Sequence, residues 1–296
     1  IRHTRRITMR IGSVFPQTES GTDPGAIKEY VQAIETLGFD HILAFDHVIG
    51  ANAESRPGWS GAYRHSDSFY EPLVLFGNIA GMTEKLELAT GIIILPQRQT
   101  ALVAKQAATV DLLSGGRLRL GIGIGWNPVE YEALGEDFSN RGKRSEEQID
   151  LLRSLWSETL LTYEGKYHKV TDAGLNPLPP DKSIPIWFGG SSNQVLKRVA
   201  QMGDGWMPTG KPDDSKKELL AQLSEHIKTE KRDPKEIGIE SWVNLKDASE
   251  KEVEDDITGW KTLGATHLSV NTMNCQMNFP EDHIKANEKF IKMARS

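Results

Sequence analysis

The stretch LELATGIIILPQRQTALVAKQAATVDLLSGGRLRLGIGIGW, residues 86–126, contains the pattern that decides the fold. Two apolar runs, 86–94 and 117–122, have the length and the Leu and Ile content of buried strands. Between them, apolar residues recur at helical spacing over 100–113, and Ser-Gly-Gly at 114–116 ends the helix. The inward face of this predicted helix consists of Val103, Ala104, Ala107, Val110 and Leu113. A strand, a helix and a second strand in this order predict a βαβ unit, in which the carboxyl ends of parallel strands are open to ligands.

The same alternation continues along the rest of the chain. Further strands are predicted over 9–15, 41–45, 184–189, 205–207, 237–243 and 267–270. Further helices are predicted over 24–37, 72–82, 129–134, 141–156, 194–202, 213–231, 249–263 and 280–294. The segment 162–180 interrupts this alternation with a hairpin turn and a proline-rich run, which we interpret as an insertion and not as a domain boundary.

Eight strand–helix repeats predict an α/β protein, a (β/α)8 TIM barrel with insertion segments, formed as a single domain by residues 9–296. An open doubly wound sheet is the structural alternative. It requires a Gly-x-Gly-x-x-Gly turn after the first strand, and residues 12–16, Gly-Ser-Val-Phe-Pro, do not provide one.

Composition narrows the class of protein. The chain has 296 residues, 38% hydrophobic and 26% charged, which is typical of globular proteins. A net charge of −6 does not indicate a nucleic-acid-binding surface, and no apolar run approaches the roughly 20 residues of a membrane helix. A single cysteine, Cys275, excludes an internal disulfide and fits a reducing compartment. We therefore expect a cytoplasmic protein, with residues 1–8 as a disordered leader outside the fold.

Several residues at predicted strand ends are candidates for a site. Asp46 and His47 follow the second strand, where a histidine could exchange a proton near neutral pH or could simply pack against a loop. Gly91 inside an apolar strand indicates either a bulge or a packing requirement. The glycines up to Gly125, with Trp126 next to them, would let a flat ring system lie close to the fourth strand.

Two further segments have two interpretations each. Gly189, Gly190 and Ser191 precede a predicted helix, so free backbone N–H groups could bind an anion there. Alternatively, the segment only provides Ser192 or Asn193 to cap the helix. Trp206 is expected more often in the core than in contact with a ligand. For the loop 50–68, with Trp59 and Tyr63, we expect a solvated surface in preference to a ligand-binding wall.

Other chemistries have little support in the sequence. Histidines and carboxylates do not have metal-ligand spacing at the predicted strand ends, so we expect no metal site. A lysine that could form a Schiff base at a strand end and a Gly-x-Ser-x-Gly nucleophile motif are also missing.

The order and spacing of several motifs resemble those of the bacterial luciferase-like superfamily of flavin- and deazaflavin-dependent oxidoreductases. The resemblance covers residues 9–296. It is carried by LGFD at 37–40, DH at 46–47, TGIIILP at 90–96, KQA at 105–107, DLLSGGR at 111–117, GIGIGW at 121–126, PIWFGGS at 185–191 and GDGW at 203–206. It implies a (β/α)8 barrel with an insertion region that binds a flavin-type ring at the carboxyl ends of its strands.

The resemblance also implies roles for individual residues. Gly91 and Ile92 would form a bulge behind the ring, commonly at a non-proline cis peptide. Gly125 and Trp126 would line the cofactor, and Gly189, Gly190 and Ser191 would hold its phosphate. Dehydrogenases of the group that act on sugar phosphates use an Asp-His pair, which implies that Asp46 contacts the cofactor and that His47 handles a proton. Those enzymes carry an acidic residue where this chain has Trp126, which argues against the same substrate.

The pattern over 114–126 is most similar to branches that use the deazaflavin coenzyme F420. We therefore expect an oxidoreductase that transfers a hydride between F420 and a small organic substrate. Two alternatives stay open: an FMN-dependent monooxygenase that uses reduced flavin and O2, and a non-catalytic protein that binds a flavin or deazaflavin. A luciferase proper is not expected, because luciferases have an arginine where this chain has Ile124. Expected partners are a flavin or F420 reductase and a second copy of the chain in a homodimer.

Overall fold

The computed structural model describes residues 9–296, so the predicted leader over 1–8 lies outside the described residues. The chain forms two compact units: Ile1–Leu43, in its described part, together with Trp187–Ser296, and Ala44–Ile186. The first unit contains the beginning and the end of the chain, and the second contains its middle. No helix among residues 9–296 is long and apolar enough to cross a lipid bilayer.

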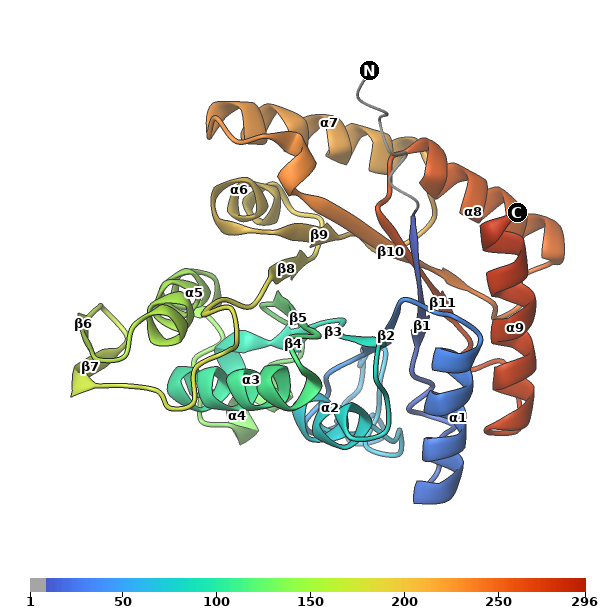
Figure 1. Cartoon of the computed structure of the whole chain (residues 1–296), viewed down its shortest axis with the longest axis horizontal. Coiled ribbons are helices and arrows are strands. Elements are labelled where there is room, and N and C mark those ends of the chain that lie inside the picture. The colour runs from blue at the N-terminus through green and yellow to red at the C-terminus, as the bar shows by residue number, and fades with distance from the viewer. Residues whose placement is uncertain (1–8) are drawn as a thin grey trace. The chain divides into compact units, whose positions relative to one another are not determined.

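Parallel strands and the helices that cover them build the first unit (Figure 1). Its strands are β1 (Arg10–Val14), β2 (His41–Ala44), β8 (Ile186–Gly189), β9 (Gly205–Met207), β10 (Gly238–Asn244) and β11 (His267–Asn271). Its helices are α1 (Pro24–Thr36), α6 (Asn193–Met202), α7 (Asp214–Thr229), α8 (Glu250–Thr262) and α9 (Glu281–Arg295), with a 3-10 turn at Pro234–Glu236. The strands pair in parallel in the order β2, β1, β11, β10, β9, β8.

The second unit contains the interrupted third strand and the insertion. Its strands are β3 (Glu87–Thr90), β4 (Ile93–Ile94), β5 (Leu118–Gly123), β6 (Leu161–Glu164) and β7 (Lys169–Ala173). Its helices are α2 (Pro72–Ala80), α3 (Thr100–Ser114), α4 (Pro128–Ala133) and α5 (Arg141–Ser157), with a 3-10 turn at Leu95–Gln97. Both β3 and β4 pair in parallel with β5, whereas β6 and β7 form an antiparallel hairpin.

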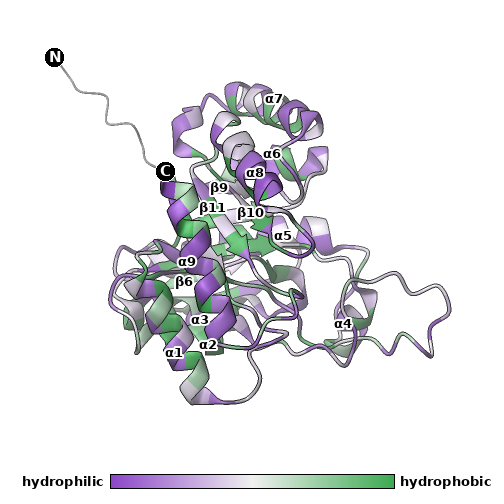
Figure 2. Cartoon of the chain, turned by 90° about the vertical axis from the view of Figure 1, so that its right-hand side faces the viewer, coloured by the Kyte–Doolittle hydropathy of each residue, from purple (hydrophilic) through white to green (hydrophobic). Residues whose placement is uncertain are grey.

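This succession of elements is that of a (β/α)8 barrel, which confirms the predicted fold class. Leaving aside the β6–β7 hairpin and counting β3 and β4 as one interrupted strand, eight parallel strands alternate with helices. The core follows the predicted pattern, since most residues of the strands are buried. Figure 2 shows green, hydrophobic strand segments near β10 and purple, hydrophilic turns in α7 and α9. That residues 9–296 fold as a single domain stays a prediction.

Helix boundaries follow the capping chemistry of the sequence. Pro24 occupies the first turn of α1, and the Asp23 side chain accepts a hydrogen bond from the Gly25 N–H. A capping box begins α8, with Ser249 and Glu252 each bonded to the other's backbone. Gly115, at φ +72°, ends α3 in the left-handed conformation that glycine adopts without steric cost.

Leu113 is the one wrong prediction for the inward face of α3. Its side chain is 63% exposed, while Asp111 and Ser114 are buried. The reason is that these two polar side chains bind the chain where it leaves the helix: Asp111 Oδ1 accepts from the Leu118 N–H, and Ser114 Oγ from the Arg117 N–H. The buried face therefore ends on polar residues, and Leu113 points outward.

Glu147 of α5 anchors the hairpin turn of the insertion. Its carboxylate accepts hydrogen bonds from the backbone N–H groups of Lys166, Tyr167 and His168 and from His168 Nδ1, at 2.7–2.8 Å. The other ring nitrogen of His168 lies 2.8 Å from Thr100 Oγ1. The hairpin is thus held against two helices by one carboxylate and one imidazole.

We expect Glu147→Ala to release this turn without unfolding the protein. Each lost hydrogen bond is worth about 1 kcal/mol, so local opening, and with it tryptic cleavage after Lys166, should become at least roughly tenfold faster. Limited proteolysis followed by mass spectrometry measures this rate. Glu158→Ala, at the exposed end of the same helix, is the matched control. An unchanged cleavage rate for Glu147→Ala would show that the anchor does not hold the turn.

Candidate active site

Asp46 lies just beyond β2 and is 3% exposed. Its Oδ2 accepts a hydrogen bond from the Ile94 N–H at 3.0 Å, and its Oδ1 accepts one from Arg98 at 2.7 Å. Burial raises the pKa of Asp46, and the positive charge of Arg98 works against that rise. Both carboxylate oxygens are therefore engaged within the protein, and they fix the position of β4.

Arg98 connects Asp46 to α2. Its guanidinium also donates to Glu71 at 2.7 Å, and Glu71 in turn caps α2 by accepting from the Val74 N–H. The Arg98 side chain is 12% exposed, compared with 1% for Asp46 and 31% for Glu71. The inner half of this three-residue network is thus an ion pair largely shielded from water.

His47, the next residue, is held by a second buried carboxylate. Glu130 of α4 is 1% exposed, and its Oε1 lies 3.1 Å from His47 Nδ1 and 3.1 Å from the Val48 nitrogen. Its Oε2 accepts from Gln97 Nε2 at 3.1 Å. Burial opposes the charge of Glu130, but the hydrogen bonds from His47, Gln97 and Val48 outweigh burial and lower its pKa.

Aromatic side chains surround the His47 imidazole. The ring centroids of Tyr63 and Phe69 lie 4.4 and 4.8 Å from that of His47, and the Trp126 ring lies 6.1 Å away. Trp126 also packs on Trp59 at 5.9 Å. The expectation of a solvated loop is wrong for Trp59 and Tyr63, which are half-buried. These two side chains are half-buried because Trp59 packs on the Trp126 ring and Tyr63 packs on the His47 ring. Arg64 and His65 are exposed, and they also line the hollow beside His47.

Two hollows open on this aromatic cluster. One, of about 240 Å3, is lined by His47 and Asn127 together with Tyr63, Phe69 and the backbone around Gly50. The other, of about 460 Å3, is lined by Trp59, Trp126 and small residues between Gly58 and Ala62. A Cβ on Gly61 would lie 2.5 Å from the Trp126 ring, so only glycine allows the loop to pack this closely. His47 therefore borders a space large enough for part of a small molecule.

The predicted bulge in the third strand is present. β3 ends at Thr90, the Gly91–Ile92 peptide is cis, and β4 resumes at Ile93. Ile92 is half-exposed although Gly91 and Ile93 beside it are buried. A Cβ on Gly123 would lie 2.1 Å from Ile92 Cδ1, and one on Gly125 2.7 Å from Ile94 Cγ2. These glycines therefore make room for the isoleucines of the interrupted strand; that Gly125 and Trp126 line a ring stays a prediction.

Gly189, Gly190 and Ser191 belong to the other unit, between β8 and α6. Gly190 has φ +109°, and the α6 cap is made by Ser192, whose Oγ accepts from the Val195 N–H. Trp206 is fully buried, as expected of a core residue, and its indole N–H donates to the Gly190 carbonyl at 2.7 Å. The hydrogen bond from Trp206 thus holds the turn before α6, and Ser191 in this turn is partly exposed.

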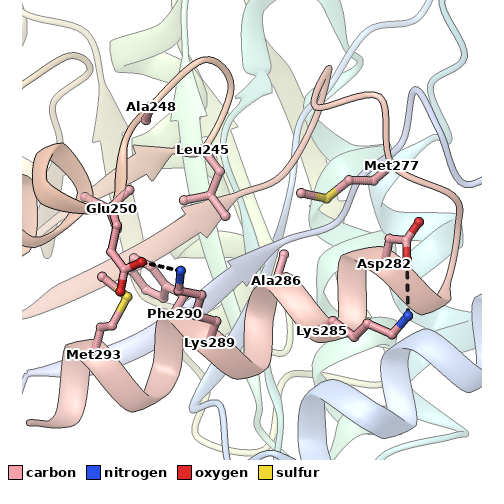
Figure 3. A pocket seen from close by; sticks show the side chains of 11 residues that line it. Leu245, Ala248, Glu250, Met277, Asp282, Lys285, Ala286, Lys289, Phe290 and Met293 are labelled. Carbon is pink, nitrogen blue, oxygen red and sulfur yellow. Dashed lines mark hydrogen bonds and ion pairs between the residues drawn. The ribbon is translucent and has the colours of Figure 1, made fainter.

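A separate cavity of about 420 Å3 lies between α8 and α9 in that same unit (Figure 3). Leu245, Met277, Phe290 and Met293 supply most of its wall. Its charged side chains pair with each other, Lys289 with Glu250 at 2.6 Å and Lys285 with Asp282 at 3.3 Å. No imidazole or thiol is among the residues that line this cavity.

Two residues of the network were missed in the sequence. Glu130 is an acidic residue between Val129 and Tyr131 in a six-residue helix, and a carboxylate flanked by apolar neighbours is a weak signal of burial. Arg98 follows the third strand among polar residues, where a basic side chain is ordinary. Only the fold places Arg98 beside Asp46, which is 52 positions away, and Glu130 beside His47, which is 83 positions away.

A barrel with a histidine–carboxylate pair at the end of a parallel strand belongs to the class of (β/α)8 proteins whose binding sites lie at that end. The family model described as luciferase-like monooxygenase matches residues 9–264. The chain belongs to this family, as the resemblance implied.

Two of three similar proteins have names that specify a cofactor, and the two cofactors differ. Rv0940c of Mycobacterium tuberculosis is 29% identical over 214 residues, which are 71% of this chain and 74% of that protein. The FMNH(2)-dependent dimethylsulfone monooxygenase of Pseudomonas fluorescens is 27% identical over 245 residues, 81% of this chain and 63% of that enzyme. The solved structure of an F420-dependent secondary alcohol dehydrogenase with an F420-acetone adduct is similar in fold, with a TM-score of 0.78, 19% identity, and coverage of 98% of this chain and 100% of that one.

We expect Arg98→Met to destabilise the protein by about 3–5 kcal/mol, because it leaves the buried Asp46 carboxyl without its counter-charge. Glu71→Gln, which breaks the more exposed half of the same network, should cost at most about 1 kcal/mol. The double variant Asp46→Asn with Arg98→Met should recover part of the loss. The free energy of unfolding in urea measures all three. Equal losses for Arg98→Met and Glu71→Gln would contradict the assignment of the inner pair as the dominant one.

Proposed function

We propose that this protein is an oxidoreductase that transfers a hydride between coenzyme F420 and a small organic substrate. The observation that carries the proposal is the His47–Glu130 pair, which sets an imidazole on the wall of a 240 Å3 hollow at the end of a parallel strand. Family membership supports redox chemistry, and an F420-dependent alcohol dehydrogenase shares the fold.

The residues around the interrupted strand fit a flat ring. Ile92 has a partly exposed aliphatic side chain at the strand break, whereas Gly91 and Ile93 on either side are buried. The nearby Ile94 N–H is already bonded to Asp46. A ring resting on Ile92 would exchange solvent contact for apolar contact. Asp46 supports this surface by holding the Ile94 N–H, and a direct contact of Asp46 with the ring stays a prediction.

The residues before α6 fit the phosphate of the cofactor. Gly190, at φ +109°, has a backbone conformation that residues with a side chain rarely adopt, and it lies just before α6, whose N-terminal end favours an anion through the helix dipole. Neither Gly190 nor Ser191 has a bulky side chain that would prevent close approach. We assign Gly189, Gly190 and Ser191 to phosphate binding on this basis.

A deazaflavin, when bound, supplies a ring carbon that accepts or gives up a hydride, and the protein supplies the proton transfer. In the oxidising direction the substrate loses a hydride and a proton together. His47 takes that proton at Nε2, and in the reducing direction it gives it back. The aromatic side chains of Tyr63 and Phe69 exclude water from one side of the imidazole.

A second candidate function is an FMN-dependent monooxygenase that uses reduced flavin and O2. It is favoured by the Pseudomonas fluorescens enzyme, whose name specifies FMNH(2) and which matches 81% of this chain. Such an enzyme needs a partner reductase to supply the reduced flavin. A non-catalytic carrier of the cofactor is the third possibility, since Trp126 stands where related dehydrogenases have an acid.

Cofactor binding decides between these functions. We expect F420 to bind more tightly than FMN when each is titrated into the purified protein and its fluorescence is followed. We also expect alcohols from a panel of small substrates to reduce bound F420. Tighter binding of FMN, together with O2 consumption in the presence of NADH and a flavin reductase, would favour the monooxygenase. Tight binding with no substrate-dependent oxidation or reduction would favour a carrier.

We expect His47→Ala to lower kcat by about 100-fold or more, because general acid–base catalysis typically contributes that much. Cofactor affinity should stay within about twofold, since the proposed contacts to ring and phosphate come from other residues. Steady-state kinetics and a cofactor titration measure the two effects. Glu54→Ala, an exposed residue of the same loop that lines neither hollow, is the control. Unchanged turnover in His47→Ala would remove His47 from the mechanism.

A further inference from the structure

We propose that Glu130 is a positioning residue that keeps the proton of neutral His47 on Nδ1, so that Nε2 is the atom that exchanges a proton with the substrate. The catalytic part of this inference rests on the function proposed above. The structural part, which ring nitrogen carries the proton, stands on its own and can be tested without a cofactor.

The carboxylate of Glu130 can only accept hydrogen bonds from its partners. Hydrogen bonds from three directions stabilise its charged form and lower its pKa, so it is ionised near neutral pH. An ionised carboxylate has no proton to donate. His47 Nδ1, 3.1 Å from Oε1, must therefore carry a hydrogen. A neutral imidazole holds one ring proton, which leaves Nε2 bare and able to accept.

The position of the carboxylate is fixed independently of His47. Gln97 donates to Oε2, and the Val48 N–H donates to Oε1, so both oxygens are held even if the imidazole is removed. Glu130 also lies on α4, which is anchored by Tyr131, whose hydroxyl donates to the Ile124 carbonyl at 2.6 Å. A carboxylate fixed in this way can set the orientation of a ring that contacts it.

The opposite ring nitrogen faces the hollow. Among the described residues, His47 Nε2 has no hydrogen-bond partner. It is also not a fully buried atom, so it is accessible from outside the protein. His47 lines the 240 Å3 hollow with Tyr63 and Phe69, whose rings limit rotation of the imidazole. The two ring nitrogens thus differ: Nδ1 is bonded to Glu130, and Nε2 is left accessible on a residue that lines the hollow.

Glu130 could instead serve only to hold the chain at Val48. The two roles differ in one observable, the tautomer of His47. A purely structural carboxylate would leave the tautomer unaffected when it is replaced by an amide, because the amide oxygen in Glu130→Gln could still accept from the Val48 N–H. A positioning carboxylate fixes the tautomer through its negative charge. The neutral amide in Glu130→Gln should therefore change the tautomer of His47.

The direct test is nitrogen NMR of the protein labelled with 15N-histidine, with the His47 signals identified by their loss in His47→Gln. In the wild type we expect neutral His47 to show a protonated Nδ1 and a bare Nε2. In Glu130→Gln the Nε2–H form should gain population. Glu132→Gln, an exposed glutamate of the same helix, should leave the spectrum unchanged. A His47 tautomer that is the same in wild type and Glu130→Gln overturns the proposal.

Kinetics test the catalytic consequence. We expect Glu130→Gln to lower kcat by roughly 10- to 100-fold with little change in KM, since misplacing a catalytic group typically costs this much. In the His47→Ala background the same substitution should have no further effect. A full additional loss in that background would mean that Glu130 acts other than through His47, and would contradict the proposal.

If Glu130→Gln does not fold, Gln97→Met replaces it. This variant keeps the carboxylate but removes the donor to Oε2, so a partial gain of the Nε2–H form is expected, and no change counts against the proposal. If His47→Ala retains full turnover while the tautomer still responds to Glu130→Gln, the proposed function fails but the positioning role of Glu130 stands.

Discussion

Two buried carboxylates, those of Asp46 and Glu130, determine how the candidate site is assembled. A charged group removed from water is strongly unfavourable unless it is paired and hydrogen-bonded. Asp46 meets this requirement with the Ile94 N–H and Arg98, and Glu130 meets it with His47, Val48 and Gln97. The segment after β2, the segment after β4 and the helix after β5 are therefore joined by bonds that are costly to leave unmade.

One consequence for the candidate site is that the backbone next to Ile92 and His47 is held in place. Ile92 and His47 are each one or two residues from a backbone group that a buried carboxylate holds. Packing by Tyr63, Phe69 and Trp126 then restricts the imidazole without adding any polar partner on its open side. The buried carboxylate holds one ring nitrogen of His47, and the other ring nitrogen stays accessible to solvent. Under the proposed function, this arrangement would allow the transfer of a single proton beside the ring of the cofactor.

Much of the fold could be predicted because its signals are local. Helical spacing over 100–113, the capping box at Ser249 and the glycine stop at 115 each depend on residues within a few positions of one another. The position of His47, Gly91 and Gly190 in or after their own strands made them candidates. The strand break at Gly91 is present in the structure, and the roles of His47 and Gly190 stay predictions. The prediction that Leu113 is buried was wrong because Asp111 and Ser114, on the same helix, form hydrogen bonds with the chain that follows it. Glu130 and Arg98 were missed because neither has a local signal that distinguishes it from a solvated charge.

The sequence by itself determined the order of strands and helices, the barrel class and the strand ends at which a site would form, since periodicity and capping act over one or two turns. Only the tertiary structure decided which side chains meet at those ends. The partner of His47 is 83 positions along the chain, and its burial depends on α4 packing beside the loop after β2. The inward turn of Trp59 and Tyr63 also depends on rings supplied by other segments. Pairings of this kind follow from the relative positions of strands in space, which no stretch of a few residues encodes.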